Sequence, residues 1–208
     1  MRGKYIVFEG VTCAGKTTHA KNLVEALNKL GYNAVYKKNA LSNSKFGSLV
    51  RQVVRTPTPE LLHDVLYFTD FYLNDLNIRK EVSNNYIVVA DRYLPSLEVF
   101  SDVHRGNVIR EIDKKIAEKL QRLSSKPDIV IYLVCSNEEK KDRMLKKKDL
   151  TKIDITDLKN EKLMNKMEEK LEEKLKRHRK VIKIDTTNKE IEEVDQEIIE
   201  RILEEIES

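Results

Sequence analysis

The stretch from Gly10 to Thr17 constrains the fold of this chain more than any other. It runs Gly-Val-Thr-Cys-Ala-Gly-Lys-Thr and matches the pattern G-x-x-x-x-G-K-[ST] in full. The apolar run KYIVFE (4–9) precedes it, and a segment with Leu23 and Leu27 on one helical face follows it. A buried strand, a glycine loop and an amphipathic helix are the context that this pattern requires. The motif therefore predicts an α/β domain that begins with a phosphate loop.

Short apolar runs recur along the chain and predict parallel strands that are buried on both faces. They occupy residues 4–9, 33–37, 86–91, 128–134 and 181–185. Segments with helical periodicity lie between and after them, at residues 16–31, 58–82, 108–123, 159–180 and 189–206. This alternation predicts a doubly wound α/β fold, with a five-stranded parallel sheet flanked by helices, in a single domain over residues 1–208.

Two local signals refine this prediction. Thr58-Pro59 predicts that the helix at 58–82 begins with a threonine N-cap followed by proline at its first position. Residues 146–158 are basic and then acidic and have no apolar period, so they predict a mobile surface segment.

The composition excludes several classes of protein. With 40% hydrophobic and 36% charged residues, the chain is too apolar to be disordered. It contains no apolar run near the roughly 18 residues that span a membrane, and no signal-peptide pattern at its start, so we expect a cytoplasmic protein. The net charge of +4 does not indicate nucleic-acid binding. Cys13 and Cys135 lack zinc-site spacing, which predicts two free thiols.

The phosphate loop predicts a nucleoside triphosphate site. Its glycines let successive backbone N–H groups face an anion, and the positive end of the following helix adds to the attraction. Lys16 can reach the outer phosphates and the Thr17 hydroxyl can ligate Mg²⁺. The residues expected to hold ATP are Gly10, Val11, Thr12, Cys13, Ala14, Gly15, Lys16, Thr17 and Thr18.

The run at 86–91 ends in the sequence ADRYLPS, which contains Asp91, Arg92 and Ser96. In an open parallel sheet, the residues at the carboxyl end of a central strand face the ligand crevice. An aspartate there can hold the Mg²⁺ shell, and an arginine beside it can clamp a second phosphate group. The alternative is a buried salt bridge that closes the strand.

Taken together, FEG…GKTT, DRY..S and KPDIVIYL resemble the thymidylate kinase family of P-loop nucleoside monophosphate kinases. EEKKDRM resembles the helix that precedes the lid of that family, and VIKIDTTNKEIEEV resembles its last strand and adenine-side loop. The resemblance covers nearly the whole chain. It implies a P-loop kinase fold with a small lid near 146–158, and a homodimer. It also implies phosphoryl transfer from ATP with Mg²⁺ to a deoxynucleoside monophosphate, above all dTMP, which gives dTDP.

The resemblance also implies roles for single residues. Lys16 would neutralise the donor phosphates, and Thr17 and Asp91 would hold Mg²⁺. Arg92 would position the acceptor phosphate, and Arg51 would face the same group. Positive charge from the lid would come from Arg143 and from the lysines at 146–148 and 152. Arg105 and Gly106 lie where the family has a substrate-side loop and are weaker candidates.

Three departures from the family pattern lie on the acceptor side. Thr12 stands where the family usually has a carboxylate for the acceptor sugar. In the stretch VLYFTDF, Tyr67 matches the aromatic that stacks on thymine and Asp70 the acidic position, but Phe71 replaces the arginine that contacts the base edge; Asn74 could donate instead. Phe100-Ser101 stands where Tyr-Gln is common. Fewer polar contacts predict weaker discrimination between bases.

Two other functions stay open at this point. A deoxynucleoside kinase also has a phosphate loop after FEG, but it needs a carboxylate after the second strand, where YKKNALSNSK contains no acid. A non-catalytic protein could bind nucleotide and signal through lid movement. A kinase with relaxed specificity is a variant of the leading hypothesis.

Overall fold

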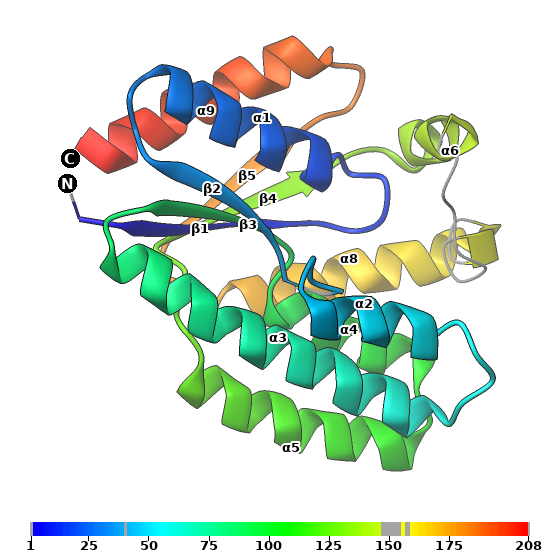
Figure 1. Cartoon of the computed structure of the whole chain (residues 1–208). Coiled ribbons are helices and arrows are strands. Elements are labelled where there is room, and N and C mark those ends of the chain that lie inside the picture. The colour runs from blue at the N-terminus through cyan, green and yellow to red at the C-terminus, as the bar shows by residue number, and fades with distance from the viewer. Residues whose placement is uncertain (1, 40, 147–154, 157–158, 208) are drawn as a thin grey trace.

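The computed structural model describes residues 2–39, 41–146, 155–156 and 159–207. Its centre is a parallel sheet in the order β2-β3-β1-β4-β5, as Figure 1 shows. The strands are β1 (Lys4–Glu9), β2 (Ala34–Lys38), β3 (Ile87–Asp91), β4 (Ile129–Val134) and β5 (Val181–Asp185). Each predicted strand is present to within one residue at each end, because continuous apolar runs of this length can be buried only inside a sheet covered on both faces.

Helices cover both faces of the sheet (Figure 1). One face carries α1 (Lys16–Lys29) and α9 (Ile191–Glu207). The other carries α3 (Glu60–Ser83), α4 (Leu94–His104), α5 (Asn107–Leu123) and α8 (Glu161–Leu175). The shorter α2 (Lys45–Val53) packs on α3, and α6 (Asn137–Leu145) follows β4. None of the described helices is long and apolar enough to cross a bilayer.

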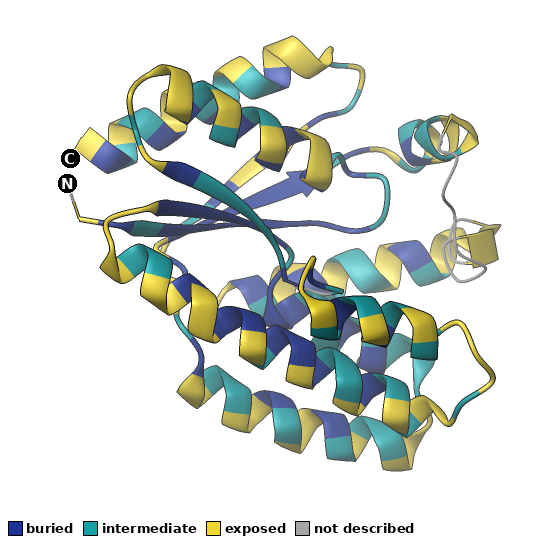
Figure 2. Cartoon of the chain, viewed as in Figure 1, coloured by how far each residue is buried: buried dark blue, intermediate teal, exposed yellow. Residues whose placement is uncertain are grey.

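The side chains of the central strands fill the core, and the exposed residues lie on the outer faces of the helices (Figure 2). Every residue of β3 is buried, as are all but the first residue of β1 and all but the last of β4. The predicted doubly wound α/β class with five parallel strands is therefore confirmed.

Three details of the helices differ from the prediction. Pro59 is itself the N-cap of α3, and the Thr58 hydroxyl bonds the His63 ring, so the predicted threonine cap is wrong. The extended backbone of Pro59 places the first helical residue at Glu60. Helix α8 is shorter than the periodic stretch 159–180. No apolar period predicted α4, which begins at the turn after β3 with Pro95 in its first turn.

The strand order places a topological switch point beside β1. From β1 the chain crosses to β2 on one side, and from β3 it passes to β4 on the other. Ligands of open α/β sheets bind outside the carboxyl ends of the strands at such a point. The register pairs Phe8 with Asp91, so the phosphate loop after β1 and the ADRY turn after β3 lie side by side.

Candidate active site

The phosphate loop has a backbone that requires glycine at both ends. Gly10 has a φ of 148°, and a Cβ there would lie 2.4 Å from the carbonyl oxygen of Leu133 on β4. Gly15 has a φ of 91°, and its Cβ would lie 2.9 Å from the ring of His19. Both positions disfavour a side chain twice over, through the positive φ and through the close neighbour. The loop is thus held tightly over the end of β4 and opens directly into α1.

Lys16 is buried at the start of α1, and its Nζ donates to the Val11 carbonyl oxygen at 2.6 Å. Burial, together with the positive charge of Arg92, lowers the pKa of Lys16 to about 7, although the carboxylates of Asp91 and Glu9 oppose the shift. An ammonium group in this setting lacks the counter-charge that a triphosphate would bring. The site is therefore suited to an anionic ligand.

Thr17 and Asp91 meet at the switch point, as an Mg²⁺ site requires. The hydroxyls of Thr17 and Tyr36 both donate to Oδ2 of Asp91. Asp91 Oδ1 is buried and has no hydrogen-bond partner within the part of the chain that the structure describes. A hydroxyl and a carboxylate oxygen are the two protein ligands that Mg²⁺ takes in phosphate-loop proteins, where phosphates and waters complete the shell. The residues present fit this ion.

Glu9 is a site residue that sequence reasoning missed. It is fully buried at the end of β1 and accepts hydrogen bonds from the Tyr93 backbone N–H (2.8 Å) and the Ser96 hydroxyl. Arg92 Nη1 donates to the same hydroxyl at 3.2 Å, from a residue with a φ of 73°. Burial raises the pKa of the Glu9 carboxyl. The rule that identified Asp91, a polar residue at the carboxyl end of a central strand, also identifies Glu9.

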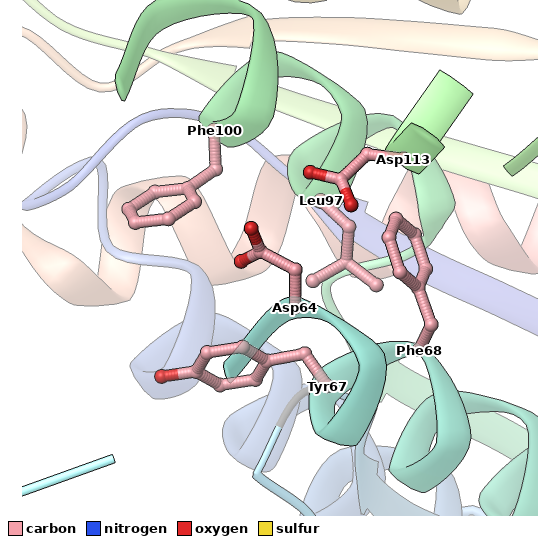
Figure 3. Close-up of a pocket in the computed structure, with 6 residues that line it drawn as sticks. All are labelled: Asp64, Tyr67, Phe68, Leu97, Phe100 and Asp113. Atoms are coloured by element: carbon pink, nitrogen blue, oxygen red, sulfur yellow. The ribbon is translucent and has the colours of Figure 1, made fainter. Parts of the chain in front are cut away.

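A small cavity lies next to this network, between α3, α4 and α5 (Figure 3). Tyr67 and Phe100, two of the three aromatic residues named at acceptor positions, both line it. In Figure 3 the Asp64 carboxylate lies between their rings. The other lining residues are Phe68, Leu97 and Asp113. Leu97 follows Ser96 on α4, so the cavity begins one residue away from the Arg92 network.

Arg143 lies in the last turn of α6 and faces the phosphate loop. Its guanidinium donates to the Thr186 carbonyl oxygen at 2.7 Å, to the Thr186 hydroxyl at 2.9 Å and to the Cys13 carbonyl oxygen at 3.4 Å. It therefore links the loop to the end of β5. The lid lysines at 147, 148 and 152, and most of the predicted lid segment 146–158, lie outside the described residues.

Comparisons with known proteins decide the family. A family model described as thymidylate kinase matches residues 8–198. The chain belongs to the thymidylate kinase family. A probable thymidylate kinase of Methanococcus aeolicus is 32% identical over 206 residues, which cover 96% of each chain. One of Methanocaldococcus jannaschii is 29% identical over 197 residues, 94% of this chain and 93% of that protein. The solved thymidylate kinase of Candida albicans, whose title refers to broad substrate specificity, matches with a TM-score of 0.75 at 18% identity over 98% of this chain and 92% of that one.

As a thymidylate kinase family member, the chain is a nucleoside monophosphate kinase. Its structure does not bring every acceptor-side candidate of the family pattern to the cavity. Phe71 is 1% exposed and packs edge-on against Tyr93 in the core. Asp70 accepts from the backbone N–H and hydroxyl of Ser42, at 2.6 Å each. Asn74 donates to the Asn39 side chain at 2.6 Å.

Arg51 donates to the carbonyl oxygens of Leu41 and Ser42, at 2.8 and 2.6 Å. It therefore holds the loop between β2 and α2, the same loop that Asp70 binds. Both residues thus bind the backbone near Ser42 and not the cavity. The two cysteines are free thiols, as predicted.

Asp113 gives this kinase a pH-dependent stability. It is buried and accepts from the Ser101 hydroxyl at 2.5 Å. Burial, with a further contribution from Asp64, raises the pKa of Asp113 to about 6 from the 3.8 of an exposed group. The folded state thus favours the protonated form, so the stability that this group contributes is complete below pH 3.8 and is lost as the pH rises through about 6.

Asp113→Asn is expected to raise the melting temperature at pH 7.5 by about 2–4 °C, corresponding to about 1 kcal/mol after solvent screening is allowed for. The gain should vanish near pH 4, where the wild-type carboxyl is already neutral. Thermal unfolding at both pH values measures this, with the exposed Asp142→Asn as the control. A lower melting temperature at pH 7.5 would mean that the charged form is the one the fold stabilises.

Proposed function

We propose that this protein transfers the γ-phosphoryl group of ATP to dTMP and produces dTDP. The observation that carries the proposal is the convergence, at one switch point, of a donor half built on Lys16, Thr17 and Asp91 and an acceptor half built on Arg92 and Ser96. Phosphoryl transfer needs little from the protein beyond positioning and electrostatic stabilisation, and these residues are of the types that provide both.

On the donor side, the backbone amides of the loop from Gly10 to Thr18 bind the phosphates, and Lys16 neutralises charge on the outer ones. Thr17 and Asp91 would hold Mg²⁺, which would neutralise charge on the donor phosphates when bound. Arg143 adds positive charge beside the loop, and its bonds to Thr186 keep it there.

On the acceptor side, Arg92 binds the phosphate of the monophosphate and aligns its oxygen with the γ-phosphorus. Ser96 and the buried Glu9 fix the Arg92 guanidinium, so that the charge is in place before the substrate arrives. Thr12 hydrogen-bonds the sugar hydroxyl, and Tyr67 stacks on the base.

The test is ADP formation from ATP and Mg²⁺ with dTMP, dUMP, dCMP, dAMP, dGMP and thymidine as separate acceptors. We expect the highest kcat/KM with dTMP. Turnover with several monophosphates at similar rates would indicate a relaxed-specificity kinase. Turnover with thymidine alone would indicate a deoxynucleoside kinase instead. ATP binding without ADP formation would indicate a non-catalytic nucleotide-binding protein.

The same proposal includes a cytoplasmic homodimer. Helix α3 exposes four apolar side chains on a single face, and Leu49 of the neighbouring α2 is exposed as well. These four residues of α3, each at least 40% exposed, are Leu62, Val65, Leu73 and Leu76. A second copy of the chain would cover this surface, which we call the α3 stripe.

Placing charge in the α3 stripe should separate the dimer. We expect Leu73→Glu with Leu76→Glu to shift the mass measured by gel filtration with light scattering from two chains to one, because burying two carboxylates in an interface is costly. Leu123→Glu, at the exposed end of α5, is the matched control. A wild-type protein of one chain's mass would refute the homodimer.

A further inference from the structure

A charged pair lies against the cavity beside Tyr67 and Phe100. Arg105 donates to both oxygens of Asp64, from Nε at 2.6 Å and from Nη2 at 2.8 Å. The Arg105 side chain is 7% exposed, and its guanidinium carbon lies 4.9 Å from the centroid of the Phe100 ring. Glu60, which is mostly exposed, lies 3.5 Å from Nη1 of the same guanidinium. Asp64 lines the cavity directly (Figure 3), and Arg105 lies next to this wall because it is bonded to the Asp64 carboxylate.

Helix α4 connects this pair to the phosphoryl-transfer site. Ser96 binds Arg92 near the start of the helix, Phe100 lines the cavity one turn later, and Arg105 follows the last helical residue. One helical turn is about 5.4 Å. A monophosphate whose phosphate is held by Arg92 would therefore carry its base toward the cavity.

The pair of Arg105 and Asp64 offers both a hydrogen-bond donor and a hydrogen-bond acceptor beside the cavity. Arg105 has five N–H groups, and two of them are used by Asp64. The Asp64 carboxylate has about four lone-pair positions, of which Arg105 takes two and the neighbouring Asp113 carboxyl a third. Asp113, also on the wall, has its pKa raised toward neutral by burial, which limits the charge that competes with Asp64. Arg105 and Asp64 can thus each form one more hydrogen bond.

The cavity is too narrow for a base as it stands. Its volume is about 10 Å³, which is room for one water molecule. Asp64, Phe68 and Asp113 are buried, whereas Tyr67 and Phe100 are only half-buried at the rim. A pyrimidine can therefore reach the charged pair only if the two rim rings part, and it would then be stacked between them.

We propose that Asp64 and Arg105 together recognise the edge of the acceptor base and select thymine and uracil over cytosine. This rests on the function proposed above and specifies the base. The O4 of uracil accepts from Arg105 while its N3–H donates to Asp64. Cytosine presents an amino donor and a bare ring nitrogen at the same two positions, so that donor meets donor and acceptor meets acceptor. Phe71, buried in the core, provides no such contact.

The test compares dUMP with dCMP, which differ only at this edge. Wild-type kcat/KM should favour dUMP, and Arg105→Ala and Asp64→Asn should each reduce the dUMP-to-dCMP ratio about 10- to 100-fold, the range for a hydrogen bond to a charged group. Arg110→Ala, on the neighbouring α5, should leave the ratio unchanged. Arg105→Lys, which retains one charged donor, should fall between wild type and alanine.

The ratio separates recognition from a structural role. If the pair only ties α3 to α4, the substitutions will lower kcat/KM for both nucleotides equally, and that result would overturn the inference. Arg105→Gln, which retains a donor, allows the comparison if the alanine variant does not fold in a thermal melt. If no monophosphate is phosphorylated, the proposed function fails instead. Calorimetric binding of dUMP and dCMP then tests the pair, and equal affinities would refute it.

Discussion

Replacing Lys16 by alanine is expected to lower kcat by about 100- to 1,000-fold, since this is the usual loss when one preorganised stabilising group is removed. Lys16 is the buried cation at the phosphate loop, and among the described residues its ammonium group donates to the carbonyl oxygen of Val11. Its lowered pKa also predicts proton uptake when a triphosphate binds near neutral pH, because the phosphates would restore the charged form. Steady-state ADP production at saturating ATP measures the loss.

Lys29→Ala is the matched control for this substitution. Lys29 is an exposed lysine at the opposite end of the same helix, about 20 Å away by the rise of an α-helix. Its removal should leave kcat unchanged. That result would show that the loss of a positive charge on α1 is not by itself enough to lower kcat. Full activity in Lys16→Ala would contradict the assignment of Gly10–Thr17 as the donor site.

Replacing Arg92 by alanine is expected to lower kcat/KM for the acceptor by about 100-fold, because an acceptor phosphate that is no longer held is misaligned for in-line attack. The KM for ATP should change little, since the loop and Lys16 remain. Arg92 has a φ of 73°, and alanine there has the same Cβ and the same backbone strain. The comparison thus isolates the guanidinium.

Two further variants locate the effect within the network. Arg92→Lys keeps the charge and the backbone but loses the planar fork, so it should recover only part of the activity. Ser96→Ala removes the hydroxyl that joins Arg92 to Glu9 and should raise the KM for the acceptor more than it lowers kcat. If Arg92→Ala or Arg92→Lys raises only the KM for ATP, Arg92 belongs to the donor half of the site.

The donor half could be predicted from the sequence because its residues are contiguous. Gly10 to Thr17 lie in one loop, and the preceding strand and following helix are visible as local periodicity. Asp91 and Arg92 were identifiable by one rule, that the carboxyl end of a buried central strand faces the ligand. The prediction missed Glu9, although the same rule applies to it and it directly precedes Gly10.

The residues proposed for the acceptor half could not be predicted in the same way, because their positions depend on how the helices are rotated about their axes. Helix α3 carries Tyr67, Phe68 and Phe71 within five residues, and its apolar residues do not form one narrow stripe. Their order in the sequence therefore does not say which ring faces a ligand. Packing against Tyr93 buries Phe71 in the core and leaves Tyr67 at the rim of the cavity.

The sequence by itself determined the sheet and the phosphate loop, because buried parallel strands and anion-binding loops are specified by neighbours along the chain. Only the tertiary structure decided which side chains meet at the cavity between α3, α4 and α5. Asp64, Phe100 and Arg105 come from α3, from α4 and from the residue that follows α4, and no local pattern links them. The physical reason is that a base-binding pocket is made by side chains from separate helices, whose relative rotation is set by the core that they share.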